Sequence, residues 1–123
     1  MGNTYTVILD DGEEIFPTIM NFAKENNIVY GFIAGGKGAL KDFDIISHGQ
    51  RGTVEKINYK KEFEVNALSG KVEARGNEVR LKMNALISSS GFTPVTGELL
   101  SGKAAGSLQI TIKSVDLKKM IEA

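Results

Sequence analysis

Residues 78–88 read EVRLKMNALIS, and apolar and polar side chains alternate through nearly the whole stretch. The apolar side chains fall on one side of an extended chain, and Arg80 and Lys82 fall on the other. Residues 107–115, SLQITIKSV, alternate in the same way. A period of two is typical of a β-strand with one buried and one solvated face. These two segments predict a sheet, with both cations on its polar side.

Further segments with β-branched or aromatic side chains surround this pair, and most of them end at Gly, Asn, Asp or Ser. We expect additional strands at residues 4–9, 28–34, 40–47, 54–59, 63–74 and 95–100. The Gly-Asn pair between Arg75 and Glu78 is typical of a β-hairpin. Loops are expected at residues 89–91 and 101–103.

Only one segment shows the spacing of apolar residues that is typical of a long helix. Apolar side chains in residues 13–26 recur at spacings of three and four, which gathers them on one helical face. Asp11 is a candidate N-cap, and the acidic side chains that follow it suit the positive end of the helix dipole. A second, short helix is expected at residues 116–122. The predicted class is therefore α+β, an antiparallel, many-stranded sheet packed by one main helix.

The chain has no linker, repeat or low-complexity tract, so residues 1–123 are expected to form a single domain. A helix of about 14 residues is only about 21 Å long, too short to cover a large sheet. Uncovered sheet must close on itself or meet another copy. We therefore predict a homo-oligomer.

Composition narrows the functional classes. The chain has 15 basic and 15 acidic side chains, so no net charge draws it to nucleic acid or lipid. It has no Cys, and His48 is its sole histidine, which excludes disulfides, thiolate zinc sites and a histidine dyad. No signal peptide or apolar membrane span is apparent. The sequence predicts a soluble, cytoplasmic protein with no membrane partner.

Several local motifs, in order, resemble the PPC (plants and prokaryotes conserved) domain family. They include Asp11-Gly12-Glu13-Glu14-Ile15 before the helix, Gly35-Gly36-Lys37-Gly38-Ala39 after a strand, Phe63-Glu64-Val65, Leu68-Ser69-Gly70 and Gly97-Glu98-Leu99. The resemblance implies an antiparallel sheet packed by a helix, usually assembled as a trimer, in proteins often labelled DNA-binding. In plants the similar domain accompanies an AT-hook. Residues 50–53, Gln-Arg-Gly-Thr, lack the second Arg and the Pro of such a hook, so DNA is the weaker candidate partner.

The resemblance also implies a site. Many bacterial members carry a His-x-His pair and a third His in a Gly-Gly-His-Leu segment, which together hold a metal. The matching positions here are Arg80, Lys82 and Glu98. Arg and Lys have no lone pair to donate, so we expect a degenerate metal pocket with neither metal nor cofactor. Two interpretations stay open: a structural ion pair of Glu98 with Lys82 or Arg80, or an anion site built from the two cations.

Two other groups of residues are candidates for binding. Gly35-Gly36-Lys37-Gly38 resembles a phosphate loop only superficially, because no Lys-Ser/Thr ending or helix follows; we expect a turn, with an anion-binding backbone nest as the alternative. The best basic cluster comprises Lys60, Lys61, Lys71, Arg75, Arg80 and Lys82, with Tyr59 nearby for stacking, and acidic side chains interrupt it.

The leading functional hypothesis is a non-enzymatic, oligomeric binding or regulatory module of the PPC type, and no catalytic residue is assigned. One alternative is a DNA-associated regulatory protein. The other is an enzyme or binder that acts on an anionic small molecule at a subunit interface, with Arg80 or Lys82 binding charge and Glu98 acting as base. An unpaired Glu98 in a deep pocket would favour the latter.

Overall fold

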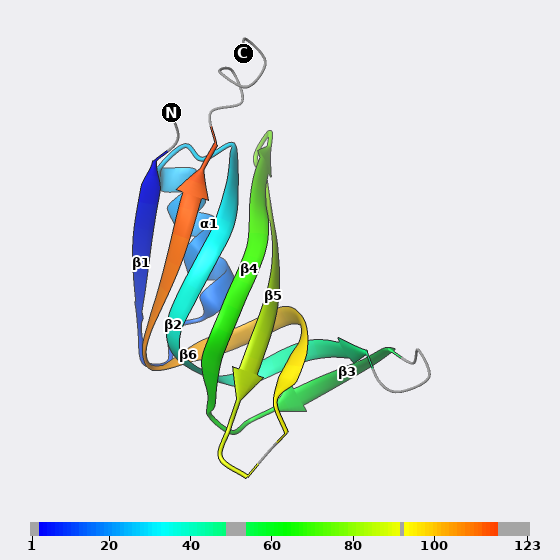
Figure 1. Cartoon of the computed structure of the whole chain (residues 1–123). Helices are drawn as coiled ribbons and strands as arrows, with labels where there is room; N and C mark the ends of the chain where they lie inside the picture. Colours follow the sequence, from blue (N-terminus) through cyan, green and yellow to red (C-terminus); the bar gives the residue numbers. More distant parts are fainter. Residues whose placement is uncertain (1–2, 49–53, 92, 116–123) are drawn as a thin grey trace.

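The computed structural model describes residues 3–48, 54–91 and 93–115, which form six strands and one helix (Figure 1). Every strand pairing is antiparallel. The α+β class and the single main helix are confirmed, whereas the helix expected at residues 116–122 lies outside the described residues. In chain order the elements are β1 (Thr4–Asp10), α1 (Ile15–Glu25), β2 (Tyr30–His48), β3 (Val54–Tyr59), β4 (Phe63–Arg75), β5 (Glu78–Ser88) and β6 (Val95–Ser114).

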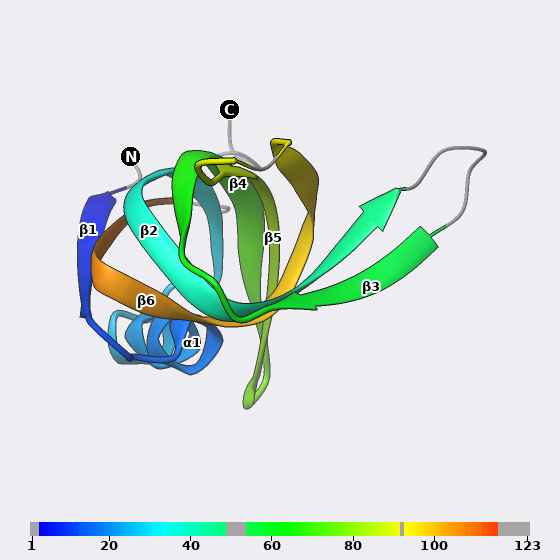
Figure 2. The same ribbon diagram turned by 90° about the horizontal axis from the view of Figure 1, so that it is seen from below.

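Four of the strands close into a ring. β6 pairs with β5, β5 with β4, β4 with β2, and β2 pairs again with β6. β1 extends the sheet beside β6, and β3 pairs with the end of β2 that projects from the ring (Figure 2). Because the sheet closes into a ring, it shields part of its own apolar face, which the single short helix cannot cover alone.

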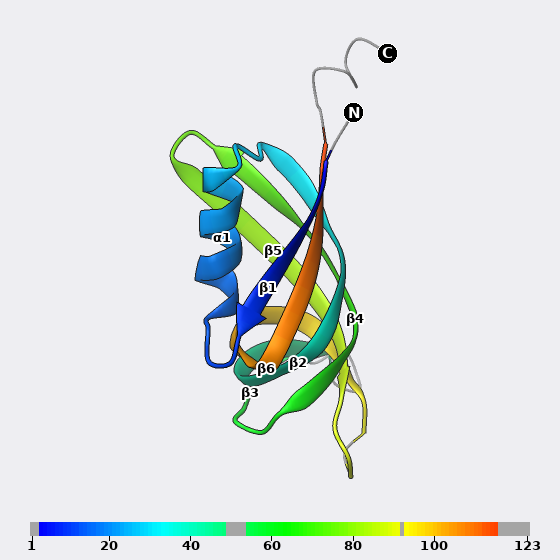
Figure 3. The ribbon, with the colours of Figure 1, turned by 90° about the vertical axis from the view of Figure 1, so that its left-hand side faces the viewer.

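α1 lies against one face of the sheet (Figure 3). Its buried residues, Ile15, Ile19 and Ala23, are spaced by four and therefore share one side of the helix. The predicted N-cap was wrong: Glu14 occupies that position, and its side chain makes no capping hydrogen bond. Within the described residues, no helix covers the face of the sheet that points away from α1.

Asp11 joins the start of this helix to the sheet instead of capping it. Its Oδ1 accepts hydrogen bonds from Lys41 Nζ and from the Gly106 backbone N–H, both at 2.8 Å. The Lys41 hydrogen bond, followed by the Gly106 amide and the Lys41 charge, lowers the pKa of the Asp11 carboxyl. Because the folded-state pKa lies below the unfolded value, this contact stabilises the fold above the ordinary pKa. Its contribution is lost as the pH falls through the lowered value.

β2 and β6 are each one continuous strand where the sequence predicted two. The expected turn at residues 35–38 lies inside β2, and the expected loop at residues 101–103 lies inside β6. The β2–β6 register shifts between Gly38 and Ala39 and between Lys41 and Asp44, and such bulges bend a strand without ending it. The Gly and Ser residues of these two segments, which the sequence analysis interpreted as the ends of strands, therefore mark bends and close contacts within continuous strands.

The core lies between α1 and the inner face of the sheet and continues into the ring. Phe43 and Phe63 are fully buried, and their ring centroids lie 5.3 Å apart. Among the described residues no polar or charged side chain is buried. Polar chemistry is therefore confined to the outer surface. Nowhere in the described ranges is there a helix with the length and apolarity to cross a membrane.

Candidate functional site

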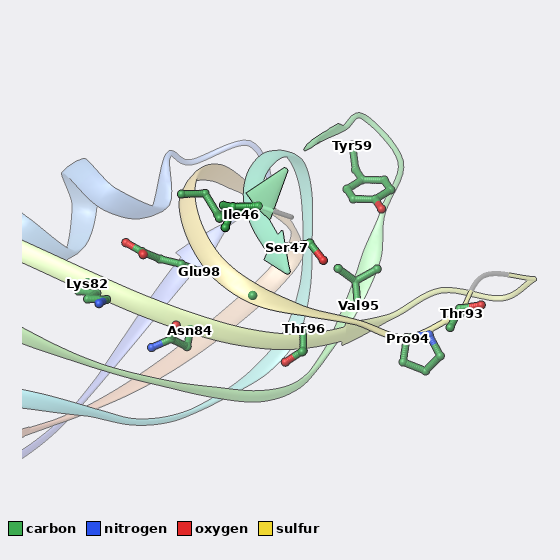
Figure 4. A pocket seen from close by; sticks show the side chains of 12 residues that line it. Ile46, Ser47, Tyr59, Lys82, Asn84, Thr93, Pro94, Val95, Thr96 and Glu98 are labelled. Carbon is green, nitrogen blue, oxygen red and sulfur yellow. The ribbon is translucent and has the colours of Figure 1, made fainter. Parts of the chain in front are cut away.

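A cavity of about 950 Å³ opens beside the projecting β2–β3 pair (Figure 4). Residues of β2 and β3 line one part of it, and residues of β5, β6 and the segment just before β6 line the rest. These strands meet here because the first part of β6 pairs with β5 on one side and with β2 on the other. The site therefore depends on the closure of the ring.

Two of the predicted site residues share this cavity. Lys82 and Glu98 both line it, together with Asn84. Asn84 lies directly opposite Glu98 in the β5–β6 register, and Lys82 precedes it by two residues on the same face of β5. Figure 4 shows these three side chains at one end of the cavity and Tyr59 and Pro94 at the other. The cavity has a charged end and a less polar end.

The predicted ion pair between Glu98 and Lys82 or Arg80 is not formed. Among the residues that the structure describes, neither Lys82 nor Glu98 has an oppositely charged partner within 4.0 Å. The Arg80 guanidinium lies 3.8 Å from a Glu78 carboxylate oxygen instead. One exposed cation and one half-buried carboxylate therefore remain without a counter-charge at the same cavity.

Arg80 belongs to a different depression, of about 300 Å³, on the outer face of the β4–β5 hairpin. Lys82 lines both hollows, whereas Glu98 lines only the larger one. The alternation of β5 places Arg80 and Lys82 on one face, as predicted, because Val79 and Met83, which flank them along the strand, are buried on the other face. The three predicted site residues therefore do not converge on one point.

These residues do not fit a metal ion. The ammonium of Lys82 and the guanidinium of Arg80 offer no lone pair, so Glu98 would be left as a single ligand. Within residues 3–48, 54–91 and 93–115, no three His, Cys, Asp or Glu side chains gather as a metal site would require. The positive charge of Lys82 would also repel a cation held in the same cavity.

The glycine segment does not form an anion-binding nest. Gly35, Gly36, Lys37 and Gly38 all pair with β6, opposite Thr111, Ile110, Gln109 and Leu108. Successive N–H groups of an extended strand point to opposite sides, whereas a nest needs them to converge.

The predicted basic cluster is divided by the fold. Lys60 pairs with Asp42 at 3.7 Å in the connection after β3, away from the β4–β5 hairpin. The ring of Tyr59 stacks on Phe43 with centroids 5.4 Å apart, so it packs against the core and not beside the lysines of the β4–β5 hairpin. Asn84 was missed as a site residue, although it continues the alternation from Arg80 and Lys82.

The remaining polar candidates do not assemble a catalytic group. Ser88, Ser89 and Ser90 line a separate depression of about 480 Å³ together with Glu62 and Glu64. No histidine is among the described residues that line it, so these hydroxyls have no imidazole base. The side chain of His48 and residues 50–53 lie outside the described part of the chain.

Comparisons with known proteins match this architecture. The PPC protein of Pyrococcus horikoshii is 23% identical, with a TM-score of 0.79 over 93% of this chain and 79% of its own. A "putative dna binding protein" of Bacteroides thetaiotaomicron is 22% identical, with a TM-score of 0.80 over 94% of this chain and 81% of its own. A metal-containing protein of Archaeoglobus fulgidus is 20% identical, with a TM-score of 0.77 over 91% and 79%.

At these identities the likeness to solved structures establishes the fold alone. No curated protein matches the chain. Residues 1–116 match the family model described as the Plants and Prokaryotes Conserved (PCC) domain. The chain therefore belongs to the Plants and Prokaryotes Conserved domain family, which is abbreviated PPC in the names of its relatives.

Proposed function

We propose that the chain is a non-enzymatic, cytoplasmic binding module of the PPC type that holds a small zwitterionic molecule in the cavity between Lys82 and Glu98. The observation that carries the proposal is the pair of opposite charges that line one cavity without meeting a partner among the described residues. An α-amino acid, with one carboxylate and one ammonium group, has the matching charges.

The charges favour a zwitterion over a simple anion or cation. A carboxylate of the ligand would accept from Lys82, and its ammonium group would donate to Glu98. Two opposite charges about 4 Å apart attract by about 4 kcal/mol at an effective dielectric near 20. A ligand with one charge would satisfy one of these side chains and be repelled by the other. Asn84, opposite Glu98, adds an amide that can donate and accept.

The cavity also has a suitable size and a second kind of surface. Its volume of about 950 Å³ lies at the upper end of the range for small-molecule sites. Tyr59, Pro94 and Val95 line the part away from Lys82 and could contact an apolar or aromatic side chain of the ligand (Figure 4). A cavity with one charged end and one less polar end supports recognition of an amino acid with a large side chain.

The site derives from the metal pocket that the family resemblance implies. The A. fulgidus relative is a metal-containing protein. In this chain a cation and a carboxylate stand at two of the presumed ligand positions, so the proposal replaces a metal with the charged groups of an organic ligand. None of the described residues at the charged end forms a paired nucleophile and base, which favours binding over catalysis.

Thermal unfolding in the presence of each standard amino acid tests the proposal. At least one should raise the Tm by several degrees, because a ligand that binds only the folded state stabilises it. Glu98→Gln and Lys82→Met should each abolish the shift. The control Glu25→Gln, an exposed carboxylate at the end of α1, should retain it.

Two kinds of result would contradict the proposal. One is that no amino acid changes the Tm, or that the shift survives both site variants. The other is that nuclear magnetic resonance shows the added amino acid converted to a product during incubation, which would make the protein an enzyme. The second result would turn Glu98 from a ligand contact into a candidate base.

We further propose that the chain assembles as the homotrimer that the family resemblance implies, with the cavity near a subunit contact. Val54, which lines the cavity, is 60% exposed, and Leu86, opposite the lining residue Thr96, is 40% exposed. A neighbouring copy would bury both side chains. Light scattering should give the mass of three chains, and the mass of one chain would contradict this assembly.

A further inference from the structure

A row of side chains crosses the sheet on the face opposite α1 and ends at Lys82, which also lines the cavity. Lys113 of β6 lies opposite Phe32 of β2, Phe32 lies opposite Lys71 of β4, and Lys71 lies opposite Lys82 of β5. Adjacent strands are about 4.8 Å apart, so Lys113 and Lys71 flank Phe32 with their backbones about 10 Å from each other. In Figure 1 this face of β6, β2 and β4 is turned toward the viewer, with α1 behind it.

The members of this row all point outward. An adjacent residue on each strand, such as Ile33 beside Phe32, Val72 beside Lys71 and Ile112 beside Lys113, is buried in the core. Phe32 is 46% exposed, which is unusual for a large apolar side chain at the centre of a sheet. Tyr30 lies beside it on the same strand, with ring centroids 5.3 Å apart and planes at 87°. The row therefore contains an aromatic platform between lysines.

The charges of this face are poorly compensated within the chain. Lys71 and Lys82 are directly opposite each other, an arrangement that destabilises an antiparallel pair. The Glu73 carboxylate is shared, with one oxygen 3.6 Å from Lys71 and the other 3.6 Å from Arg75. Lys113, like Lys82, has no acidic partner within 4.0 Å in the described part of the chain. An external polyanion would supply the missing negative charge.

We propose that this face binds single-stranded nucleic acid, with a base stacked on Phe32 and phosphates on Lys113, Lys71 and Lys82. A solvated antiparallel sheet with exposed aromatic rings among cations suits an unpaired strand, because every base offers a flat face for stacking. A ring fixed on a sheet face cannot reach bases inside a duplex. The neutral total charge is no obstacle, since the cations are local to this face.

The charge and the ring together select this partner. An acidic peptide without aromatic side chains would satisfy the lysines but leave Phe32 with no planar partner, whereas every nucleotide offers both a phosphate and a base. The two proposals share Lys82, which also lines the cavity, but Phe32 and Lys113 do not line it, so changing these two residues tests the sheet face alone.

Fluorescence anisotropy with labelled oligothymidylate, oligouridylate and a duplex tests the proposal on the full chain. A single strand should bind at about 50 mM salt and more weakly at about 200 mM. Phe32→Ala should weaken binding roughly tenfold, which is within the range for one base stacked on an aromatic ring. Lys71→Gln and Lys113→Gln should each reduce the slope of log affinity against log salt by about 0.7.

Lys24→Gln is the matched control, because this exposed lysine lies on α1, behind the sheet, and should leave the affinity unchanged. Tighter binding of oligouridylate identifies RNA as the natural partner, and tighter binding of oligothymidylate identifies DNA. The proposal fails if no single strand binds at low salt, if the duplex binds equally well, or if folded Phe32→Ala keeps full affinity. It also fails if Phe32→Ala changes only the mass of the assembly, which would make this face a subunit contact.

Discussion

Gly38→Ala is expected to destabilise the native state by about 3 kcal/mol, as overpacking of a close contact does. Gly38 has a φ of +130°, which L side chains rarely adopt, and an added Cβ would lie 2.3 Å from the Ser107 carbonyl oxygen. That oxygen belongs to the backbone of the neighbouring strand β6, so it cannot move aside as the end of a flexible side chain can. Urea unfolding followed by circular dichroism gives the free energy of unfolding for both proteins.

Gly35→Ala is the matched control on the same strand. An added Cβ at Gly35 has no atom within 4 Å, so the free energy of unfolding should change by less than about 1 kcal/mol. Equal decreases in the free energy of unfolding at Gly35 and Gly38 would contradict this account. They would mean that the close approach of β6 is not the reason why position 38 requires a glycine.

Phe43→Ala should lower the free energy of unfolding by about 4 kcal/mol. Phe43 is fully buried and contacts two other rings, Tyr59 at 5.4 Å and Phe63 at 5.3 Å between centroids. Its removal would leave a cavity in the part of the core where β2, β3 and β4 meet. Against a typical stability of roughly 5–15 kcal/mol, this loss removes a large fraction of the total.

Phe32→Ala provides the comparison for Phe43, because it removes the same ring from the same strand but on the exposed face. It should change the free energy of unfolding by less than about 1 kcal/mol. Urea unfolding that showed similar losses at both positions would contradict the assignment of Phe43 to the core and of Phe32 to the solvated face.

The sequence predicted the elements where the pattern is local. The alternation in residues 78–88 correctly gave β5 and its polar face, and Gly76 lies in the predicted connection with a φ of +62°. The same reasoning failed at Gly38, because a glycine required by a neighbouring strand looks in the sequence like a glycine required by a turn. Only the pairing of β2 with β6, about 70 residues apart, distinguishes the two cases.

For the candidate site, too, the sequence predicted only the features that depend on a local pattern. Alternation placed Arg80 and Lys82 on one face, but it could not say which residue of β6 lies opposite which residue of β5. The observed register sets Asn84, and neither Arg80 nor Lys82, directly opposite Glu98, and the expected ion pair is not formed. Register between distant strands follows from the packing of the whole sheet and is not readable from either strand alone.

Phe32 was missed for a related reason. Residues 28–34 are apolar on both faces of the strand, so the sequence does not reveal which side meets solvent. The structure resolves this through Ile33, which is buried and thereby fixes Phe32 on the outer face.

The most direct test of the account is a crystal structure of the protein with the amino acid that raises its Tm most. We predict a ligand carboxylate within about 3 Å of Lys82 Nζ and a ligand ammonium group at a similar distance from Glu98. Density for a metal ion held by Glu98, or a direct Lys82–Glu98 ion pair with no ligand between them, would contradict it.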